Sequence, residues 1–207
     1  MVISYFGGAF IKATFGDTVI AIDPIGKSVS GKAARFGADL AFVSCPAPLF
    51  NGVEGLTGGS KEPFIIDGPG EYEYSGIFAK GYESAGPDGL VNTIYTFVLE
   101  GIRVVHLGAL ANTSVAPEVL EDISGADIMI VPAGDGGTIS ARASAKFAAS
   151  LEPKIIIPVL YGDFNSDLMK EFLSEVGETK VDPQEKLSIK KKDFEGKEAE
   201  LVVLQAN

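Results

Sequence analysis

The sequence predicts an α/β fold in which two β-sheets pack face to face and helices cover their outer sides. Short apolar and β-branched runs that predict strands outnumber the segments with helical periodicity. The predicted helices lie between strands along the chain, which favours a layered arrangement over a sandwich of strands alone. Glycine, with 25 of the 207 residues, exceeds its average share and punctuates the apolar runs, as expected for many strands joined by tight turns.

The predicted strands are short runs rich in β-branched and aromatic residues. They cover residues 2–6, 10–14, 18–22, 40–43, 64–66, 77–80, 93–99, 103–106, 128–131, 155–159, 187–190 and 200–204. Several of them are continuous apolar runs, which is typical of strands buried on both faces. The charge-dense stretch 186–200 between the last two strands predicts a solvated hairpin tip.

Three segments have helical signals. Residues 117–123 begin with a proline suited to the first helical turn, and residues 140–150 are rich in alanine. Residues 167–176 place apolar side chains at helical spacing, with Ser166 as the expected N-cap and Gly177 as the expected stop.

A weak internal repeat relates residues 10–24 to residues 95–110. Each unit predicts a hairpin whose second strand runs into a loop, which contains Asp23 in the first unit and follows His106 in the second. Duplicated halves would bring the two loops to one edge of the fold.

Composition excludes several classes of function. The chain has 17 Lys and Arg against 28 Asp and Glu, a net charge of −11, which disfavours nucleic acid and anionic lipid as partners. One Cys and one His exclude an intrachain disulfide and a zinc site built from several such ligands. With no secretion signal and no apolar run long enough to span a membrane, we expect a cytoplasmic protein with one domain over residues 1–207.

Eight short runs occur in the order typical of one family. They are YFGGAF at 5–10, VIAIDP at 19–24, ADLAFVS at 38–44, FIIDGPGEYE at 64–73, NTIY at 92–95, HLG at 106–108, VPAG at 131–134 and LEPKIIIP at 151–158. This series resembles the metallo-β-lactamase superfamily, in particular its small branch of predicted zinc-dependent hydrolases related to ascorbate 6-phosphate lactonase. The resemblance implies a four-layer αββα sandwich over the whole chain and a capacity to form homo-oligomers through flat outer surfaces.

The resemblance also shows where that family holds its metals, and here those positions lack ligands. The H-x-H-x-D-H positions are Cys45, Ala47, Leu49 and Phe50, the bridging aspartate is Ala109, the last histidine is Leu160, and the opening motif has Gly8 in place of histidine. A two-zinc hydrolase needs several imidazoles to hold the ions and acidify a bridging water. We therefore predict no metal and no cofactor.

The first hypothesis is a metal-free, non-catalytic protein that acts in binding, as a scaffold or as a subunit beside a protein partner. A residual pocket for an unidentified small molecule would be lined by Gly8, Asp23, Cys45, Ala109, Leu160, Tyr161 and Asp163. The bulky residues at 49, 50 and 160 predict a filled cavity, whereas glycines at 8, 108 and 162 leave the possibility of space. On this hypothesis a family-based hydrolase label describes ancestry and not chemistry.

The alternative is a hydrolase that uses a non-standard site. Cys45 follows a predicted strand and is the one candidate nucleophile, with His106 at a neighbouring strand end as its base. Asp67, Glu71 and Glu73, on a predicted Pro- and Gly-rich turn, are candidate oxygen ligands for Mg²⁺ or Ca²⁺. A buried structural thiol, a core imidazole and solvated turn carboxylates are the structural interpretations of the same residues.

Overall fold

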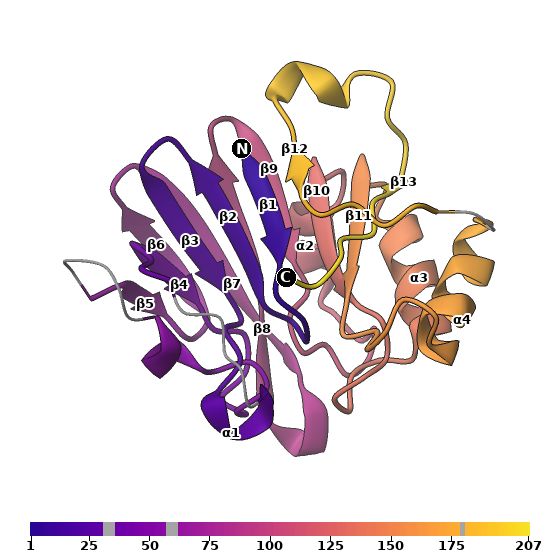
Figure 1. Ribbon diagram of the computed structural model, residues 1–207, viewed down its shortest axis with the longest axis horizontal. Coiled ribbons are helices and arrows are strands. Elements are labelled where there is room, and N and C mark those ends of the chain that lie inside the picture. The colour runs from indigo at the N-terminus through magenta and orange to yellow at the C-terminus, as the bar shows by residue number, and fades with distance from the viewer. Residues whose placement is uncertain (31–35, 57–61, 179–180) are drawn as a thin grey trace.

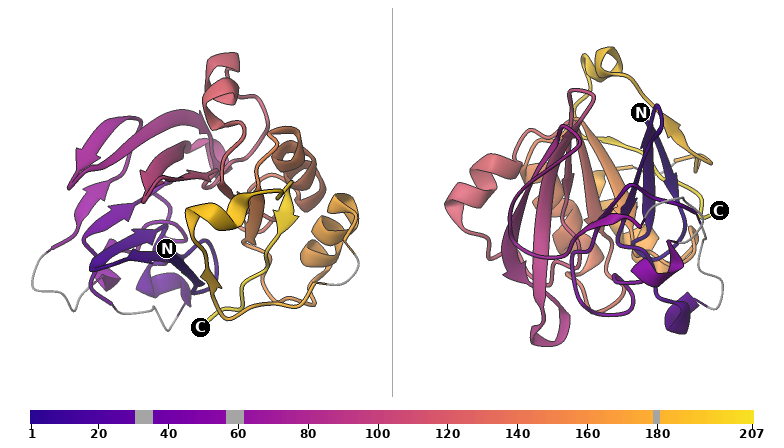
Figure 2. Two further views of the ribbon diagram at one scale, coloured as in Figure 1. Left: turned by 90° about the horizontal axis from the view of Figure 1, so that it is seen from above. Right: turned by 90° about the vertical axis from the view of Figure 1, so that its left-hand side faces the viewer.

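Two β-sheets pack face to face in the structure, a computed structural model that describes residues 1–30, 36–56, 62–178 and 181–207 (Figure 1, Figure 2). The six-stranded sheet has the order β12-β1-β2-β3-β4-β5, with strands at Leu187–Ser188, Val2–Tyr5, Ile11–Phe15, Thr18–Ile22, Leu40–Phe42 and Phe64–Ile66. The seven-stranded sheet has the order β13-β11-β10-β9-β8-β7-β6, with strands at Glu200–Leu201, Ile155–Val159, Ile128–Pro132, Ile102–His106, Val91–Leu99, Ile77–Ala85 and Gly70–Tyr74. The predicted fold class is confirmed.

Helices cover the outer side of the seven-stranded sheet. Helix α2 (Pro117–Ile123) connects β9 to β10, α3 (Ala141–Ser150) packs on β10, and α4 (Asp167–Val176) packs on α3 (Figure 1). The six-stranded sheet differs, because its outer side is covered mainly by Phe36 and the 3₁₀ turn Val53–Gly55 together with Phe10. The described one-turn helix α1 (Lys27–Ser30) is exposed at residues 27–29 beside this layer.

The helix ends follow the predicted capping chemistry. Ser166 Oγ accepts a hydrogen bond from Met169 N at 3.1 Å, and Gly177 ends α4 in the left-handed region with φ of 78°. The apolar side of α4 buries Met169 and Phe172. Among the described residues, no helix has the length and apolar character needed to cross a bilayer.

Strand β6 was not expected from the sequence, and the placement of Glu71 and Glu73 on a turn is wrong. Both residues lie in β6, which pairs with β7 after the two-residue turn at Ser75 and Gly76. These turn residues have φ of 50° and 80°, the geometry of a tight hairpin turn. Alternation of glutamate and tyrosine over residues 71–74 was the strand signal, and the preceding Gly and Pro residues obscured it.

The predicted hairpin at the C-terminus is also wrong. β12 pairs with β1, whereas β13 pairs with β11, so the stretch between them passes from one sheet to the other. Two short strands joined by a polar stretch are compatible with one hairpin and with placement in different sheets. Tertiary packing therefore determines which pairing forms.

The two repeat units have the same pairing pattern. Strands β2 and β3 form an antiparallel hairpin, and β3, β4 and β5 then run parallel. Strands β8 and β9 likewise form an antiparallel hairpin, and β9, β10 and β11 run parallel. Asp23, directly after β3, lies 2.6 Å from His106, the last residue of β9, so the ends of these two strands lie side by side.

Asp127, just before β10, joins three other segments. Its carboxylate accepts hydrogen bonds from Arg103 N at 2.8 Å, Lys154 Nζ at 2.7 Å and Lys191 Nζ at 2.5 Å. Burial raises the pKa of Asp127, but the hydrogen bonds from the two lysines and from Arg103 N outweigh burial and leave the pKa below its usual value. The ionised carboxylate therefore stabilises the folded state.

We predict that Asp127→Asn lowers the free energy of unfolding at pH 7 by about 1–3 kcal/mol. Since the folded-state pKa is depressed, the stabilisation is present above the unfolded pKa of about 3.9 and is lost as pH falls through the folded pKa. Urea titrations at pH 7, 5 and 3 should show the wild-type and variant converging at the lowest pH. A constant difference at all three values would contradict an origin in ionisation.

Candidate functional site

The carboxyl ends of parallel strands in both sheets bring the candidate site residues together. Asp23 follows β3, Cys45 lies three residues after β4, His106 ends β9 and Leu160 follows β11. In the family that the sequence resembles, this edge holds the metals. The geometry of this edge therefore decides what chemistry the chain supports.

A buried carboxylate organises the edge. Asp23 is inaccessible to solvent, and its Oδ1 and Oδ2 accept hydrogen bonds from Ser44 N and Ser44 Oγ, both at 2.7 Å. Asp23 Oδ2 also lies 2.6 Å from His106 Nε2, across the interface between the two sheets. A carboxylate has only acceptors here, so Nε2 is assigned as the donor.

His106 Nε2 is therefore occupied by its hydrogen bond to Asp23. The imidazole is inaccessible to solvent, and its Nδ1 has no hydrogen-bond partner among the described residues. Ser44, which the sequence analysis did not single out, supplies two of the three donors to Asp23. Its position directly before Cys45, at the end of the run ADLAFVS, was the available signal.

A second polar clamp fixes the loop after β9. Asn92 Nδ2 donates to Leu107 O at 3.0 Å, and Asn92 Oδ1 accepts from Ala109 N at 2.6 Å. A Cβ at Gly108 would lie 2.4 Å from Ser44 Cβ and 2.5 Å from Asn92 Oδ1, so this position admits only glycine. The loop thus holds Ala109 in a fixed place although Ala109 carries no functional group.

Apolar side chains occupy the space where the family resemblance places metal ligands. A Cβ at Gly136 would lie 2.5 Å from Leu49 Cδ2, and a Cβ at Gly8 would lie 3.5 Å from Leu49 Cδ1. Leu49 therefore lies between these two glycines. Phe50 and Leu160 are each 1% exposed, and both lie within 4 Å of the same hypothetical Cβ at Gly136.

Several residues of the predicted residual pocket lie at these strand ends. Leu160 N donates to Gly8 O at 2.7 Å, and Asp23, Cys45 and Ala109 are buried along the strand ends. A Cβ at Gly8 or Gly108 would contact a neighbour at 2.6 Å or less, whereas a Cβ at Gly162 would meet nothing within 4 Å.

Tyr161 and Asp163, two residues of the predicted residual pocket, differ in their exposure to solvent. Tyr161 is buried and donates to Leu204 O at 2.5 Å, and burial, aided by the charge of Asp163, raises its pKa to about 12. Asp163 is exposed and accepts from Asn165 N at 2.8 Å in the turn before α4.

Cys45 lacks the environment of a nucleophile. The residue is 1% exposed, and burial raises the thiol pKa while a hydrogen bond with the backbone of Ala47 acts in the opposite direction. Among the hydrogen bonds of the described residues, none joins Cys45 to His106, whose Nε2 is bonded to Asp23. A raised pKa and burial are properties of an inert structural thiol.

The donor set does not fit a zinc centre. Over residues 1–30, 36–56, 62–178 and 181–207, no three His, Cys, Asp or Glu side chains are grouped so that they would hold a metal ion. Asp67, Glu71 and Glu73 are among these described residues, so they are not gathered as a Mg²⁺ or Ca²⁺ site. Glu71 instead lies 3.8 Å from Lys80 Nζ, and Glu73 Oε1 accepts from Gly76 N at 2.9 Å.

Comparisons with known proteins agree with this architecture. Residues 2–160 match the sequence profile of the beta-lactamase superfamily domain. UPF0173 protein PF0020 of Pyrococcus furiosus is 30% identical over 86 residues, which span 41% of this chain and only 40% of that protein.

Solved structures extend the likeness to the whole chain. A proposed zinc-dependent hydrolase of the metallo-β-lactamase superfamily from Thermotoga maritima has a TM-score of 0.75 and 28% identity, covering 98% of this chain and 97% of that one. A proposed metal-dependent hydrolase from Parabacteroides distasonis has a TM-score of 0.68 and 15% identity, covering 98% and 93%. The second likeness is one of fold alone.

We predict that Cys45 in the folded protein reacts with a thiol-specific disulfide reagent at least about a hundredfold more slowly than in urea, because burial limits access and raises the pKa. Absorbance of the released thiolate at pH 7 to 9 measures the rate. Fast labelling of the folded protein would indicate an activated thiol.

We predict that Asp23→Ala lowers the free energy of unfolding by about 3–5 kcal/mol, because three buried donors lose their acceptor. Asp23→Asn is the matched control, since asparagine keeps the volume and one acceptor and tolerates the positive φ of 46°. Urea unfolding should rank the variants as wild-type, Asn and Ala in decreasing stability. A loss below about 1 kcal/mol for alanine would contradict the assigned role.

Proposed function

The chain belongs to the metallo-β-lactamase superfamily, and we propose that within this superfamily the protein is a metal-free, non-catalytic member that acts by binding. The observation that carries the proposal is the packing of Leu49 between Gly8 and Gly136, beside Phe50 and Leu160. Apolar side chains there supply no ligand to an ion and take up the volume that a metal-bound water needs.

The hydrogen bonds of Asp23 and Asn92 also support the proposal. Asp23 still joins Ser44 to His106, and Asn92 still holds the loop that carries Ala109. These contacts fix strand ends relative to one another, which is useful to a scaffold whether or not a metal is bound. The differences from the family pattern therefore concentrate at the ligand positions and leave the supporting structure in place.

The net charge of the chain supports the proposed class of partner. A net charge of −11 disfavours nucleic acid, so a protein partner, including a second copy of this chain in a homo-oligomer, is the proposed class. The proposal places this binding in the cytoplasm. A non-standard hydrolase centred on Cys45 has less support, because that thiol is buried and is not bonded to His106.

We predict that the purified protein, incubated with Zn²⁺, Mn²⁺ or Fe²⁺ and then dialysed, retains less than about 0.1 equivalent of metal, because among the described residues no three His, Cys, Asp or Glu side chains are grouped to hold an ion. Elemental mass spectrometry measures the content. The same samples should not hydrolyse ester, lactone or phosphodiester model substrates. Stoichiometric metal, or hydrolysis that is abolished in Cys45→Ser, would overturn the proposal.

A ligand-restored variant provides the matched positive control. It combines Cys45→His, Ala47→His, Leu49→Asp, Phe50→His, Ala109→Asp and Leu160→His, the substitutions that the family pattern specifies. If the variant folds by circular dichroism, it should bind more metal than the wild-type protein, because the polar clamps still position these strand ends. Equal metal content in both folded proteins would contradict the assignment of these positions.

A further inference from the structure

One edge of β6 is an unpaired sheet edge. β6 pairs with β7, and within the described part of the chain no strand lies against its other edge. β5, the last strand of the facing sheet, ends on the same side of the molecule (Figure 1). An unpaired edge presents backbone N–H and C=O groups with which another extended chain can pair.

The hairpin geometry identifies which groups point outward. The two-residue turn makes its flanking residues, Tyr74 and Ile77, a hydrogen-bonded pair, and such pairs then alternate along the ladder. Tyr72 and Gly70 are therefore bonded to β7, whereas the N–H and C=O groups of Glu71 and Glu73 face the free edge. Two consecutive rungs of an added antiparallel strand would form at these two residues.

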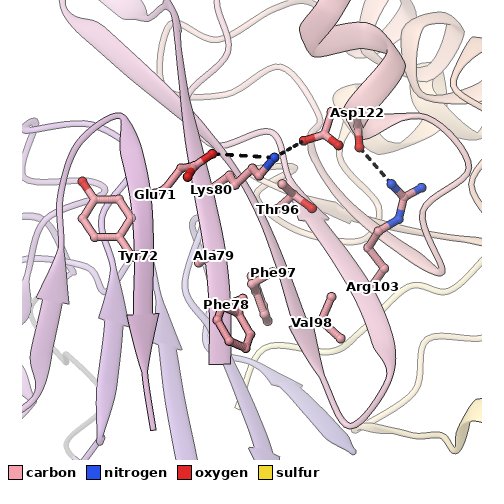
Figure 3. Close-up of a pocket in the computed structure, with 10 residues that line it drawn as sticks. All are labelled: Glu71, Tyr72, Phe78, Ala79, Lys80, Thr96, Phe97, Val98, Arg103 and Asp122. Atoms are coloured by element: carbon pink, nitrogen blue, oxygen red, sulfur yellow. Dashed lines mark hydrogen bonds and ion pairs between the residues drawn. The ribbon is translucent and has the colours of Figure 1, made fainter. Parts of the chain in front are cut away.

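The outer face beside this edge offers an apolar hollow whose charged lining residues are two carboxylates, Glu71 and Asp122, and two cations, Lys80 and Arg103. Figure 3 shows Glu71, Lys80 and Asp122 along one side of the hollow and the apolar side chains Phe78 and Val98 along the other. The hollow measures about 270 Å³. Phe78 is 67% exposed and Val98 is 42% exposed, so two apolar side chains of this hollow are open to solvent.

The inner face of the edge is apolar. The Tyr74 ring stacks on Phe64 of β5 with centroids 5.1 Å apart and an interplanar angle of 16°. Phe64 lies at the open side of the two-sheet core, and 43% of it is exposed. A strand added to β6 would place its inward side chain against this aromatic pair.

We propose that the free edge of β6 binds an extended segment of a partner protein as an added antiparallel strand, with basic residues opposite Glu71 and Glu73 and an apolar residue between them. The apolar residue lies opposite Tyr72, beside the Phe64–Tyr74 pair, and the aliphatic stem of the basic residue opposite Glu73 extends across β6 toward Phe78, which pairs with Glu73. This inference goes beyond the proposed function, because it holds whether or not the protein hydrolyses a substrate.

Charge argues against a second copy of the chain as the occupant. An antiparallel pair of two β6 edges would align Glu71 with Glu73 of the other copy, or either glutamate with itself. Like charges directly opposite one another destabilise a strand pair, whereas opposite charges stabilise it by about 0.2–1 kcal/mol, which corresponds to as much as fivefold in affinity for each pair. A basic partner strand is therefore favoured.

The test uses the full chain and a fluorescein-labelled peptide of sequence Gly-Lys-Val-Lys-Val-Lys, with Gly-Glu-Val-Glu-Val-Glu as its matched control. Fluorescence anisotropy at low salt should give saturable binding of the basic peptide alone, weakening as salt rises. Hydrogen exchange should show protection of the Glu71 and Glu73 amides on binding. Absence of binding up to about 1 mM peptide, or protection elsewhere only, would overturn the inference.

One double variant tests the role of charge, and a pair of single variants tests the role of backbone pairing. Glu71→Lys combined with Glu73→Lys should reverse the preference, so that the acidic peptide binds and the basic peptide does not. Glu73→Pro and Glu73→Ala both remove the carboxylate, but only proline removes the outward N–H, without breaking a bond to β7. Binding to the proline variant should be at least threefold weaker than to the alanine variant, and equal affinities would overturn strand addition.

Discussion

The hydrogen-bonded carboxylate of Asp23 is the contact on which the rest of the site depends. It lies in a loop after the six-stranded sheet, and it binds His106 at the end of a strand in the seven-stranded sheet. Ser44 N and Oγ donate two further hydrogen bonds to this carboxylate and fix the start of the segment that carries Cys45 and Leu49. A buried charge without these partners would be strongly destabilising, so the three residues must stay in register.

The backbone at the positions where the family pattern places ligands is held without help from the side chains there. The positions of Ala109 and Leu160 are held by backbone bonds, Ala109 N to Asn92 Oδ1 and Leu160 N to Gly8 O, and neither bond requires a particular side chain. Apolar residues at these positions remove the cost of burying unpaired ligands. Leu49 then fills the space between the glycines and contributes to the core.

At the free edge of β6, the charges of Glu71 and Glu73 affect both self-association and the choice of partner. Glutamates at alternate positions keep the edge soluble and oppose its pairing with a copy of itself. The same charges leave the backbone rungs available to a strand of opposite charge. Protection from self-association and selection of a partner therefore have a common physical origin in Glu71 and Glu73.

Sequence analysis alone predicted the two-sheet α/β fold, the three longer helices with the caps of α4, and the lack of histidine and aspartate at the positions where the family pattern places metal ligands. These features depend on local periodicity, on capping chemistry and on which residue types are present, and all three are readable without coordinates. It missed β6, because glycine and proline before Glu71 obscured the alternation. It also joined residues 187–190 to residues 200–204 in one hairpin.

Which polar and apolar groups come into contact depends on tertiary packing. His106 bonds to Asp23 and not to Cys45, Tyr161 turns inward to Leu204, and Leu49 closes the gap that glycines at 8 and 136 would otherwise leave. These outcomes depend on the packing of segments more than 40 residues apart, and distances between such segments are set by the register of two sheets. Local sequence contains no record of that register, because each strand satisfies its own pattern in more than one pairing.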